Sequence, residues 1–190
     1  MTIDQSSAGA VQNDVSLASD EDLLARFLQA GGDASKASLQ ELARRHEHRL
    51  LGLALGLCDG REHLAREAVQ ESWVRVIRHA GTFRGRSSFA TWVYRITVHR
   101  CRDVMARERA IAKREGRVGV TKIGSPIDDA ELREAVARLP LHEREVVLLC
   151  HMRGMTHEQA AAVLGIPPGT LKTRLTRAKK RLRDAMGGER

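Results

Sequence analysis

The sequence is poor in aromatic residues and prolines, and it has no long hydrophobic run. Aromatic residues make up 3% of the 190 residues while hydrophobic residues in total reach 42%, so the cores must be built from Leu, Val, Ile and Ala. There are four prolines, and no stretch alternates Val, Thr or Tyr with polar residues, which predicts an all-α protein. No apolar run approaches the roughly 20 residues that a membrane-spanning helix needs.

Cysteines are few, and a secretory signal is missing. Cys58, Cys101 and Cys150 lie far apart and form no CxxC pair, so we interpret them as reduced thiols of a cytoplasmic protein. The N-terminus carries acidic residues where a signal peptide carries basic and apolar ones. Basic residues, in contrast, are abundant. The net charge of +8 favours a polyanionic partner, nucleic acid before membrane, because no amphipathic segment carries a large aromatic or Leu face beside its basic one.

The first half of the chain predicts a tail followed by a four-helix domain. Residues 1–19 contain no Lys or Arg, which predicts a disordered acidic tail. Apolar residues recur at helical spacing through residues 20–110 and predict a compact bundle. The GGDAS stretch at 31–35 is expected to separate the first two helices. The helices are expected from Asp20, over about 36–58, over about 62–80, and from an N-cap at Ser87 or Ser88.

Two sets of apolar side chains are assigned to the core of this bundle. The helix over 62–80 is expected to bury Leu64, Ala68, Val69, Trp73, Val76, Ile77 and Ala80. Trp92 is also assigned to the core, rather than to base melting, because it lies in the apolar stripe of the fourth helix.

The second half of the chain predicts a linker and a smaller helical domain. Residues 111–127 are basic, contain glycines and have few apolar residues, which predicts a partly extended linker. Residues 128–187 predict a second domain of short helices, with a break at Pro140 and a turn at the RGM stretch.

Residues 156–187 carry the signals of two helices joined by a tight turn. Thr156 and Gln159 fit a capping box at the start of a short helix. Gly165 stands where a helix ends in a left-handed residue. Pro168 suits the first position of the next helix, because its missing N–H is not needed there. This arrangement predicts a helix-turn-helix.

The helix that begins at Pro168 has one apolar and one strongly basic side. Its buried stripe is expected to be Leu171, Leu175, Ala178, Leu182 and Ala185 or Met186. Its opposite side is expected to project Lys172, Thr173, Thr176, Arg177 and Lys180. Lys, Arg and Thr side chains can read base edges in a DNA major groove. The alternative is a solvated basic helix packed on a bundle, which the capped helix and glycine turn before it disfavour.

Two stretches of the chain resemble bacterial sigma factors. The stretch LP-x3-REVVLL-x4-GMTHEQAAAVLGIPPGTLKTRLTRAKKRL is similar to their region 4, which reads the −35 promoter element. The stretch REAVQESWVRVIRHAGTFRGRSSFATWVYRITVHRCRDV (66–104) is similar to their region 2, which binds core RNA polymerase and opens the −10 element. A layout of these two regions alone, over about residues 20–186, resembles the extracytoplasmic-function (ECF) group of the sigma-70 family.

The resemblance implies two small all-α domains that act in transcription. Such a protein directs promoter-specific initiation by reading the −35 and −10 elements and by stabilising the open −10 region. It is not an enzyme and needs no cofactor or metal. Its partners are promoter DNA, the clamp helices and flap of core RNA polymerase, and an anti-sigma factor that holds it inactive.

The resemblance also implies roles for individual residues. The residues that match the helix docking on the polymerase clamp are Glu67, Gln70, Glu71 and Arg75. Those that match the −10 element reader are Phe83, Arg84, Gly85, Ser87, Arg95, His99 and Arg102. Phe83 can stack on a flipped base, while Arg95 and Arg102 can follow the phosphates.

The −35 reader comprises the start of the basic helix and its exposed side. Gly169 and Thr170 leave free backbone N–H groups that suit a phosphate. The full set is Pro168, Gly169, Thr170, Lys172, Thr173, Arg174, Thr176, Arg177 and Lys180.

Three positions depart from the family pattern. His99 stands where many members carry Asn, which predicts a different −10 base preference. Glu67 replaces a common Asp in the docking helix. Cys150 stands where an Arg often helps to hold the −35 element, so that contact is not expected in this chain.

Two other functions compete with a sigma factor. A stand-alone helix-turn-helix regulator would bind palindromic DNA as a dimer, but it does not need a region 2. A nuclease or deaminase would need a carboxylate cluster or an HxE…CxxC pattern, which the sequence lacks.

Overall fold

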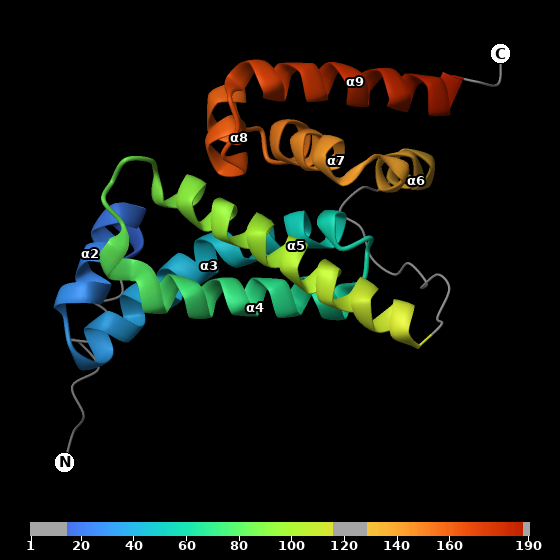
Figure 1. Ribbon diagram of the computed structural model, residues 1–190. Coiled ribbons are helices and arrows are strands. Elements are labelled where there is room, and N and C mark those ends of the chain that lie inside the picture. Colours follow the sequence, from blue (N-terminus) through green and yellow to red (C-terminus); the bar gives the residue numbers. More distant parts are fainter. Residues whose placement is uncertain (1–14, 116–128, 188–190) are drawn as a thin grey trace.

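The computed structural model describes residues 15–115 and 129–187. Within these two ranges the chain forms helices joined by turns, without a β-strand (Figure 1), which confirms the all-α prediction. The first 14 residues of the predicted tail and residues 116–127 of the predicted linker lie outside the described ranges. No helix in these ranges is both long and apolar enough to cross a membrane.

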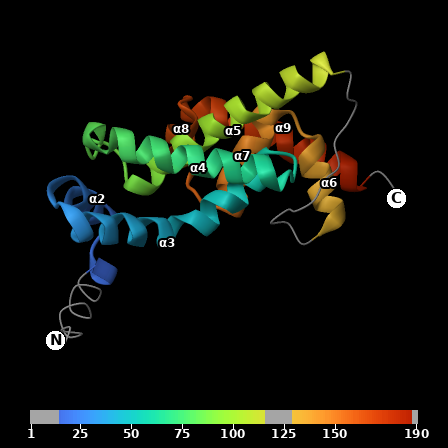
Figure 2. The ribbon, with the colours of Figure 1, turned by 90° about the horizontal axis from the view of Figure 1, so that it is seen from below.

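Four long helices form the N-terminal part of the fold: α2 (Asp20–Gln29), α3 (Gly32–Leu57), α4 (Glu62–His79) and α5 (Phe89–Arg114). α3 and α4 lie side by side and α5 packs on both of them (Figures 1 and 2). A one-turn helix, η1 (Ala80–Thr82), and the loop after it connect α4 to α5. Serine hydroxyls cap α2 and α5, because Ser19 Oγ accepts from the Asp22 N–H and Ser88 Oγ accepts from the Thr91 N–H.

The N-terminal part differs from the sequence-based expectation in three places. α3 begins at Gly32, because Gly31 alone of the GGDAS stretch takes the extended N-cap conformation. Gly32 enters the helix with a left-handed φ of 60°. Residues 15–19 were expected to belong to the disordered tail, but Val15 is buried and Ala18 packs against the core. α5 continues through residues 111–114, which the sequence assigns to the linker; no Gly or Pro interrupts the helix before Gly116.

The C-terminal part consists of three short α-helices, a π-helical turn and one longer α-helix. They are α6 (Ala130–Arg138), α7 (Leu141–Val147), the π-helical turn η2 (Leu148–Met152), α8 (His157–Leu164) and the longer α9 (Pro168–Gly187). The predicted capping box is present, since Thr156 and Gln159 each bond the other's backbone N–H with their side chains. Gly165 ends α8 in the left-handed conformation, with φ 66° and ψ 36°. The helix-turn-helix prediction is therefore confirmed for α8 and α9.

The two parts pack against each other and share one hydrophobic core cluster. α8 lies over α5 (Figure 1). η2 contacts α3. Gly52 and Gly56 of α3 permit this approach: a Cβ on Gly56 would lie 2.8 Å from Leu148 Cδ1, and one on Gly52 would lie 2.9 Å from Arg153 Nη2. The buried side of α3 is therefore shaped for the C-terminal part as well as for its own bundle.

Candidate functional site

α9 presents a basic surface opposite its core contacts. Leu171, Leu175 and Ala178 are buried, which confirms the first half of the predicted apolar stripe. The predicted reading residues Lys172, Thr173, Thr176, Arg177 and Lys180 are exposed, and Arg174 is half-buried. Cationic side chains on one exposed helix face have the arrangement that a DNA groove requires.

The apolar stripe does not continue to the end of α9. Leu182 is half-buried, Ala185 is exposed and Met186 is 41% exposed. The expected burial of Ala185 or Met186 is therefore wrong, because no described element covers the last turn. Arg181, near this end, forms an ion pair of 3.1 Å with the buried Glu143 of α7 and so holds the helix in place.

The threonine hydroxyls of α9 are used within the helix. Thr173 Oγ1 donates to Gly169 O and Thr176 Oγ1 donates to Lys172 O, both at 3.0 Å. With the proton directed to the preceding turn, each side chain offers its methyl group and an oxygen acceptor outward. At the start of α9, Pro168, Gly169 and Thr170 are exposed.

The loop between η1 and α5 gathers four of the predicted −10 residues: Phe83, Arg84, Gly85 and Ser87. The Phe83 ring is half-buried against Trp92, with ring centroids 5.4 Å apart. Gly85 is left-handed, with φ 65°. Arg84 Nη1 donates to Gly81 O at 2.9 Å, which keeps its side chain close to the loop. Trp92 is half-buried and packs against the core, in agreement with its assignment to the core.

The other three predicted −10 residues lie farther along α5, and two of them, Arg95 and Arg102, contact the C-terminal part. Arg95 donates from Nε and Nη2 to Ala162 O of α8, with Nε at 3.0 Å. Arg102 binds Glu145 of α7 with two hydrogen bonds of 2.6 and 2.7 Å, and Glu145 is 1% exposed. Both arginines therefore contact protein in this arrangement. Sequence reasoning missed this, because no local signal marks a contact 43 residues away.

His99 lies beside these arginines at a cavity between α4 and α5. The cavity has a volume of 330 Å³ and is also lined by Arg75, Trp92 and Arg95. Partial burial, and then the charge of Arg102, lower the pKa of the His99 imidazole. A neutral imidazole can both donate and accept a hydrogen bond, so it can contact a base edge much as an Asn side chain does.

The predicted polymerase-docking residues lie along one side of α4. Gln70, Glu71 and Arg75 line a cavity of 420 Å³ together with Val74, Arg78, His79 and Arg100. Glu67 lies one turn earlier, and its carboxylate is 3.3 Å from Arg107 of α5. Arg107 also donates to Glu71 at 2.7 Å. The structure therefore brings all four predicted residues to one helix side.

Two apolar residues of this surface were not predicted. Val74 is 41% exposed and Ile77 is 46% exposed, so the assignment of Ile77 to the buried stripe is wrong. The other predicted stripe residues that are buried are Leu64, Ala68, Val69, Val76 and Ala80. The signal in the sequence was the spacing of Val74, four residues after Gln70 and four before Arg78, on the polar side of the helix.

Comparisons with known families and proteins agree with this division of the chain. The model of Sigma-70 region 2 matches residues 42–111, and the model of Sigma-70, region 4 matches residues 129–182. Together the two matches cover more than half of the chain. They fall on the bundle with the α4 surface and on the helix-turn-helix with the basic α9.

Curated relatives include ECF sigma factors. The ECF RNA polymerase sigma factor SigM of Mycobacterium tuberculosis is 32% identical over 172 residues, which cover 89% of this chain and 85% of SigM. The ECF RNA polymerase sigma factor SigE of Mycolicibacterium smegmatis is 30% identical over 176 residues, which cover 83% of this chain and 65% of SigE. The chain thus spans slightly less than two thirds of the length of SigE.

Solved structures share the fold. The sigma factor RpoE from Bartonella quintana, in complex with the anti-sigma factor NepR, superposes with a TM-score of 0.67 at 22% identity, over 80% of this chain and 98% of RpoE. CnrH, in complex with the cytosolic domain of CnrY, superposes with a TM-score of 0.68 at 23% identity, over 90% and 99% of the two chains. The matches to both sigma-70 regions and to SigM show that the chain belongs to the extracytoplasmic-function group of the sigma-70 family, whose members are non-enzymatic subunits that direct RNA polymerase to promoters.

Proposed function

We propose that this protein docks on core RNA polymerase through α4 and reads promoter DNA with the loop before α5 and with α9. The observation that carries the proposal is the presence, in one chain, of a region 2 bundle with an exposed docking surface and a region 4 with an exposed basic helix. A stand-alone helix-turn-helix regulator does not need the first of these surfaces. The sigma function is therefore favoured over that alternative.

The docking surface on α4 combines apolar and polar contacts. Val74 lines the cavity with Gln70 and Arg75, and Ile77 lies about one turn farther along α4; both are large exposed apolar residues. Exposed apolar side chains within a polar rim are typical of a protein interface. We assign this surface to the clamp helices of the polymerase and the basic α9 to the −35 element.

Reading of the −10 element requires the two parts of the molecule to separate. Arg95 and Arg102 can follow DNA phosphates only after they leave Ala162 and Glu145. The same separation gives α9 and the loop before α5 the freedom to reach two distant promoter elements. Docking on the polymerase would supply the free energy for it, through the contacts that α4 gains.

We further propose that an anti-sigma factor binds this protein and holds it inactive. The similar fold of RpoE, which was solved in complex with the anti-sigma factor NepR, supports such a partner. The protein would act in the cytoplasm, where RNA polymerase and the chromosome lie. We propose residues 20–110 as the region 2 domain and 128–187 as the region 4 domain. Because Val15 and Ala18 pack against the core and α5 continues to Arg114, the tail and the linker are shorter than residues 1–19 and 111–127.

In vitro transcription tests the proposed function. Bacterial core polymerase, with and without the protein, is incubated with a randomised promoter library, and the transcripts are sequenced. Transcripts that depend on the protein and share two spaced motifs are expected. DNA binding without any protein-dependent transcript would contradict the proposal and favour the stand-alone regulator.

A further inference from the structure

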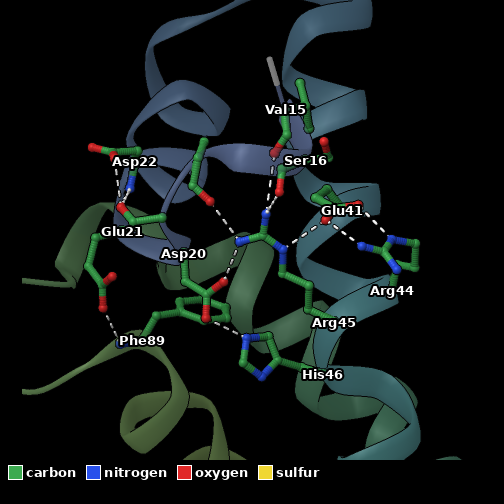
Figure 3. A network of polar contacts seen from close by, with 12 residues as sticks. Val15, Ser16, Asp20, Glu21, Asp22, Glu41, Arg44, Arg45, His46 and Phe89 are labelled. Carbon is green, nitrogen blue, oxygen red and sulfur yellow. Dashed lines mark hydrogen bonds and ion pairs between the residues drawn. The ribbon is translucent and has the colours of Figure 1, made fainter. Parts of the chain in front are cut away.

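We propose that α2 positions the loop that reads the −10 element, with Glu21, Asp20 and His46 as positioning residues. The proposal rests on the function proposed above. Asp20 and Glu21 lie before the matched region 2 and His46 lies near its N-terminal edge. Together they connect α2 and α3 to the start of α5. Figure 3 shows the contacts of Asp20 with His46 and of Glu21 with Phe89.

Glu21 binds the backbone at the point where the loop becomes a helix. Its Oε1 accepts the N–H of Phe89 at 2.8 Å, across 68 residues of sequence. Phe89 is the first residue of α5, so its N–H has no acceptor within the helix. A carboxylate at this end also interacts favourably with the helix dipole. Glu21 therefore fixes the first peptide of α5 from outside the loop.

A second contact holds the Phe89 side chain. His46 of α3 is 6% exposed, and its Nε2 lies 2.6 Å from Asp20 Oδ2. The His46 ring meets the fully buried Phe89 ring edge-on, with centroids 5.4 Å apart. Asp20 sets the orientation of His46, and His46 in turn forms one wall of the site that holds Phe89.

The contacts continue from Phe89 into the loop. Phe89 packs on Trp92 with centroids 5.9 Å apart, and Trp92 packs on Phe83 with centroids 5.4 Å apart. Phe83 is the residue assigned to base stacking. Aromatic pairs of this kind have preferred tilted geometries, so a shift of Phe89 would be passed through Trp92 to Phe83.

Arg45 makes α2 a fixed support for these contacts. Its guanidinium donates to Ser16 O and Ala18 O, both at 2.7 Å, and to Asp20 Oδ1 at 3.0 Å. It also donates to Glu41 Oε1 at 2.7 Å within α3. A planar guanidinium bonded on several sides fixes the segment before α2, and the Asp20 carboxylate, against α3.

Substitutions at Glu21 test the proposal in the full-length protein bound to core polymerase. Glu21→Ala removes the acceptor, whereas Glu21→Gln keeps a carbonyl oxygen at the same place. Glu62→Ala is the matched control, because Glu62 is an exposed acid of a helical first turn that pairs with Arg66. The DNA is a promoter selected in the transcription experiment, with 2-aminopurine placed in turn along the non-template −10 strand to report base capture by fluorescence.

Glu21→Ala is expected to weaken base capture about tenfold, which corresponds to about 1.4 kcal/mol. Glu21→Gln and Glu62→Ala should stay within about twofold of the wild type. Core binding and binding of a −35 duplex should not change for any variant. His46→Gln, which can still bond Asp20 but lacks the ring, should weaken base capture in the same direction.

Two results would overturn the proposal. One is equal base capture by Glu21→Ala and Glu21→Gln. The other is a Glu21→Ala variant whose core binding and −35 binding weaken as much as its base capture, which indicates general destabilisation. If the wild-type protein itself fails to support transcription, the result counts against the proposed function instead. The proposal is supported if Glu21→Ala weakens base capture at the −10 element alone and Glu21→Gln restores it.

Discussion

The turn between α8 and α9 depends on the backbone of a single residue. Gly165 has φ 66°, and no atom lies within 4 Å of the place where a Cβ would be. The requirement for glycine is therefore conformational and not steric, since a residue with a Cβ is strained in the left-handed region. The exit angle of α8, and with it the placement of α9, follows from this residue.

Substitution of alanine for Gly165 should destabilise the protein, whereas the same substitution at Gly169 should not. Gly165→Ala is expected to lower the free energy of unfolding by about 1 kcal/mol. Gly169→Ala should be neutral or slightly stabilising, because Gly169 lies within α9 and also has nothing within 4 Å of its Cβ position. Urea unfolding of both variants measures the difference. Equal losses would mean that the turn tolerates other backbone conformations.

The three cysteines should differ in reactivity. Cys101 is 1% exposed, and its hydrogen bond with Cys58 and its burial raise the pKa of its thiol well above the usual value. Cys58 is fully buried, while Cys150 is half-buried. Only the thiolate reacts, so iodoacetamide at about pH 8 should label Cys150 first and the other two only after unfolding. Mass spectrometry of the digested protein measures the order in which the three cysteines are labelled. Early labelling of Cys101 would contradict its burial.

At the scale of elements, α3 is stabilised at its N-terminal half by one carboxylate between two arginines. Glu41 accepts from Arg44 Nε at 2.7 Å and Nη2 at 2.8 Å, and from Arg45 Nε at 2.7 Å. The hydrogen bonds from Arg44 and from Arg45 lower the pKa of Glu41 from its usual 4.5 to about 2. This cluster joins α3 to the segment before α2 through Arg45.

Glu41→Gln should lower the stability of the protein in a manner that depends on pH. A carboxyl whose pKa falls on folding stabilises the native state fully above its unfolded pKa, and this contribution disappears as the pH drops through the folded pKa. The stability difference between wild type and Glu41→Gln should therefore be constant above about pH 5 and shrink from there toward about pH 2. Urea titrations along this range measure it. A difference that does not change with pH would show that the ionised carboxylate is not responsible.

Helix ends that are set by local signals could be predicted from the sequence, and surfaces set by neighbours could not. The Thr156–Gln159 box and the left-handed Gly165 each involve residues a few positions apart, so the chain itself carries the signal. The start of α3 at Gly32 was missed, because a Gly-rich stretch permits helix and loop alike. The exposure of Ile77 was missed because the bundle covers only one side of α4, and a periodic pattern does not reveal how wide that side is.

At the scale of the whole molecule, the packing of the two parts is held by contacts between residues far apart in sequence. Besides Arg95 and Arg102, Arg144 of α7 bonds Asp59 in the turn after α3. Sequence reasoning assigned Arg95 and Arg102 to DNA from the family pattern alone. Their protein partners could not be predicted, because nothing local links α5 to Glu145 or Ala162.

The pair Arg102–Glu145 should give opposite effects on DNA binding when either partner is removed. Glu145→Ala is expected to loosen the packing of the two parts and free Arg102, so binding of a −10 bubble fragment should rise. Arg102→Ala should loosen the packing as well, since it leaves the buried Glu145 carboxylate without its partner. It should nevertheless lower DNA binding, because a phosphate contact is lost.

Small-angle scattering and fluorescence anisotropy separate the two effects. Both variants should have a larger radius of gyration than the wild type, while their affinities for the fragment move in opposite directions. Arg66→Ala, which removes one partner of the exposed Arg66–Glu62 pair on α4, serves as the control. A parallel change in affinity for Glu145→Ala and Arg102→Ala would mean that Arg102 has no role on DNA.

The glycines at 52 and 56 have a further consequence for how stability is distributed over the molecule. A glycine inside a helix costs about 1 kcal/mol relative to alanine whether or not anything packs against it. The close approach of Leu148 and Arg153 that these positions permit exists only while the two parts are together. The N-terminal bundle is thus weaker on its own than its length and composition would allow, and it recovers that loss only when the C-terminal part is in place. In a chain with alanine at position 56, the N-terminal bundle would be more stable and the two parts would associate more weakly. The free energy of unfolding the bundle would therefore rise, while the free energy of separating the two parts would fall.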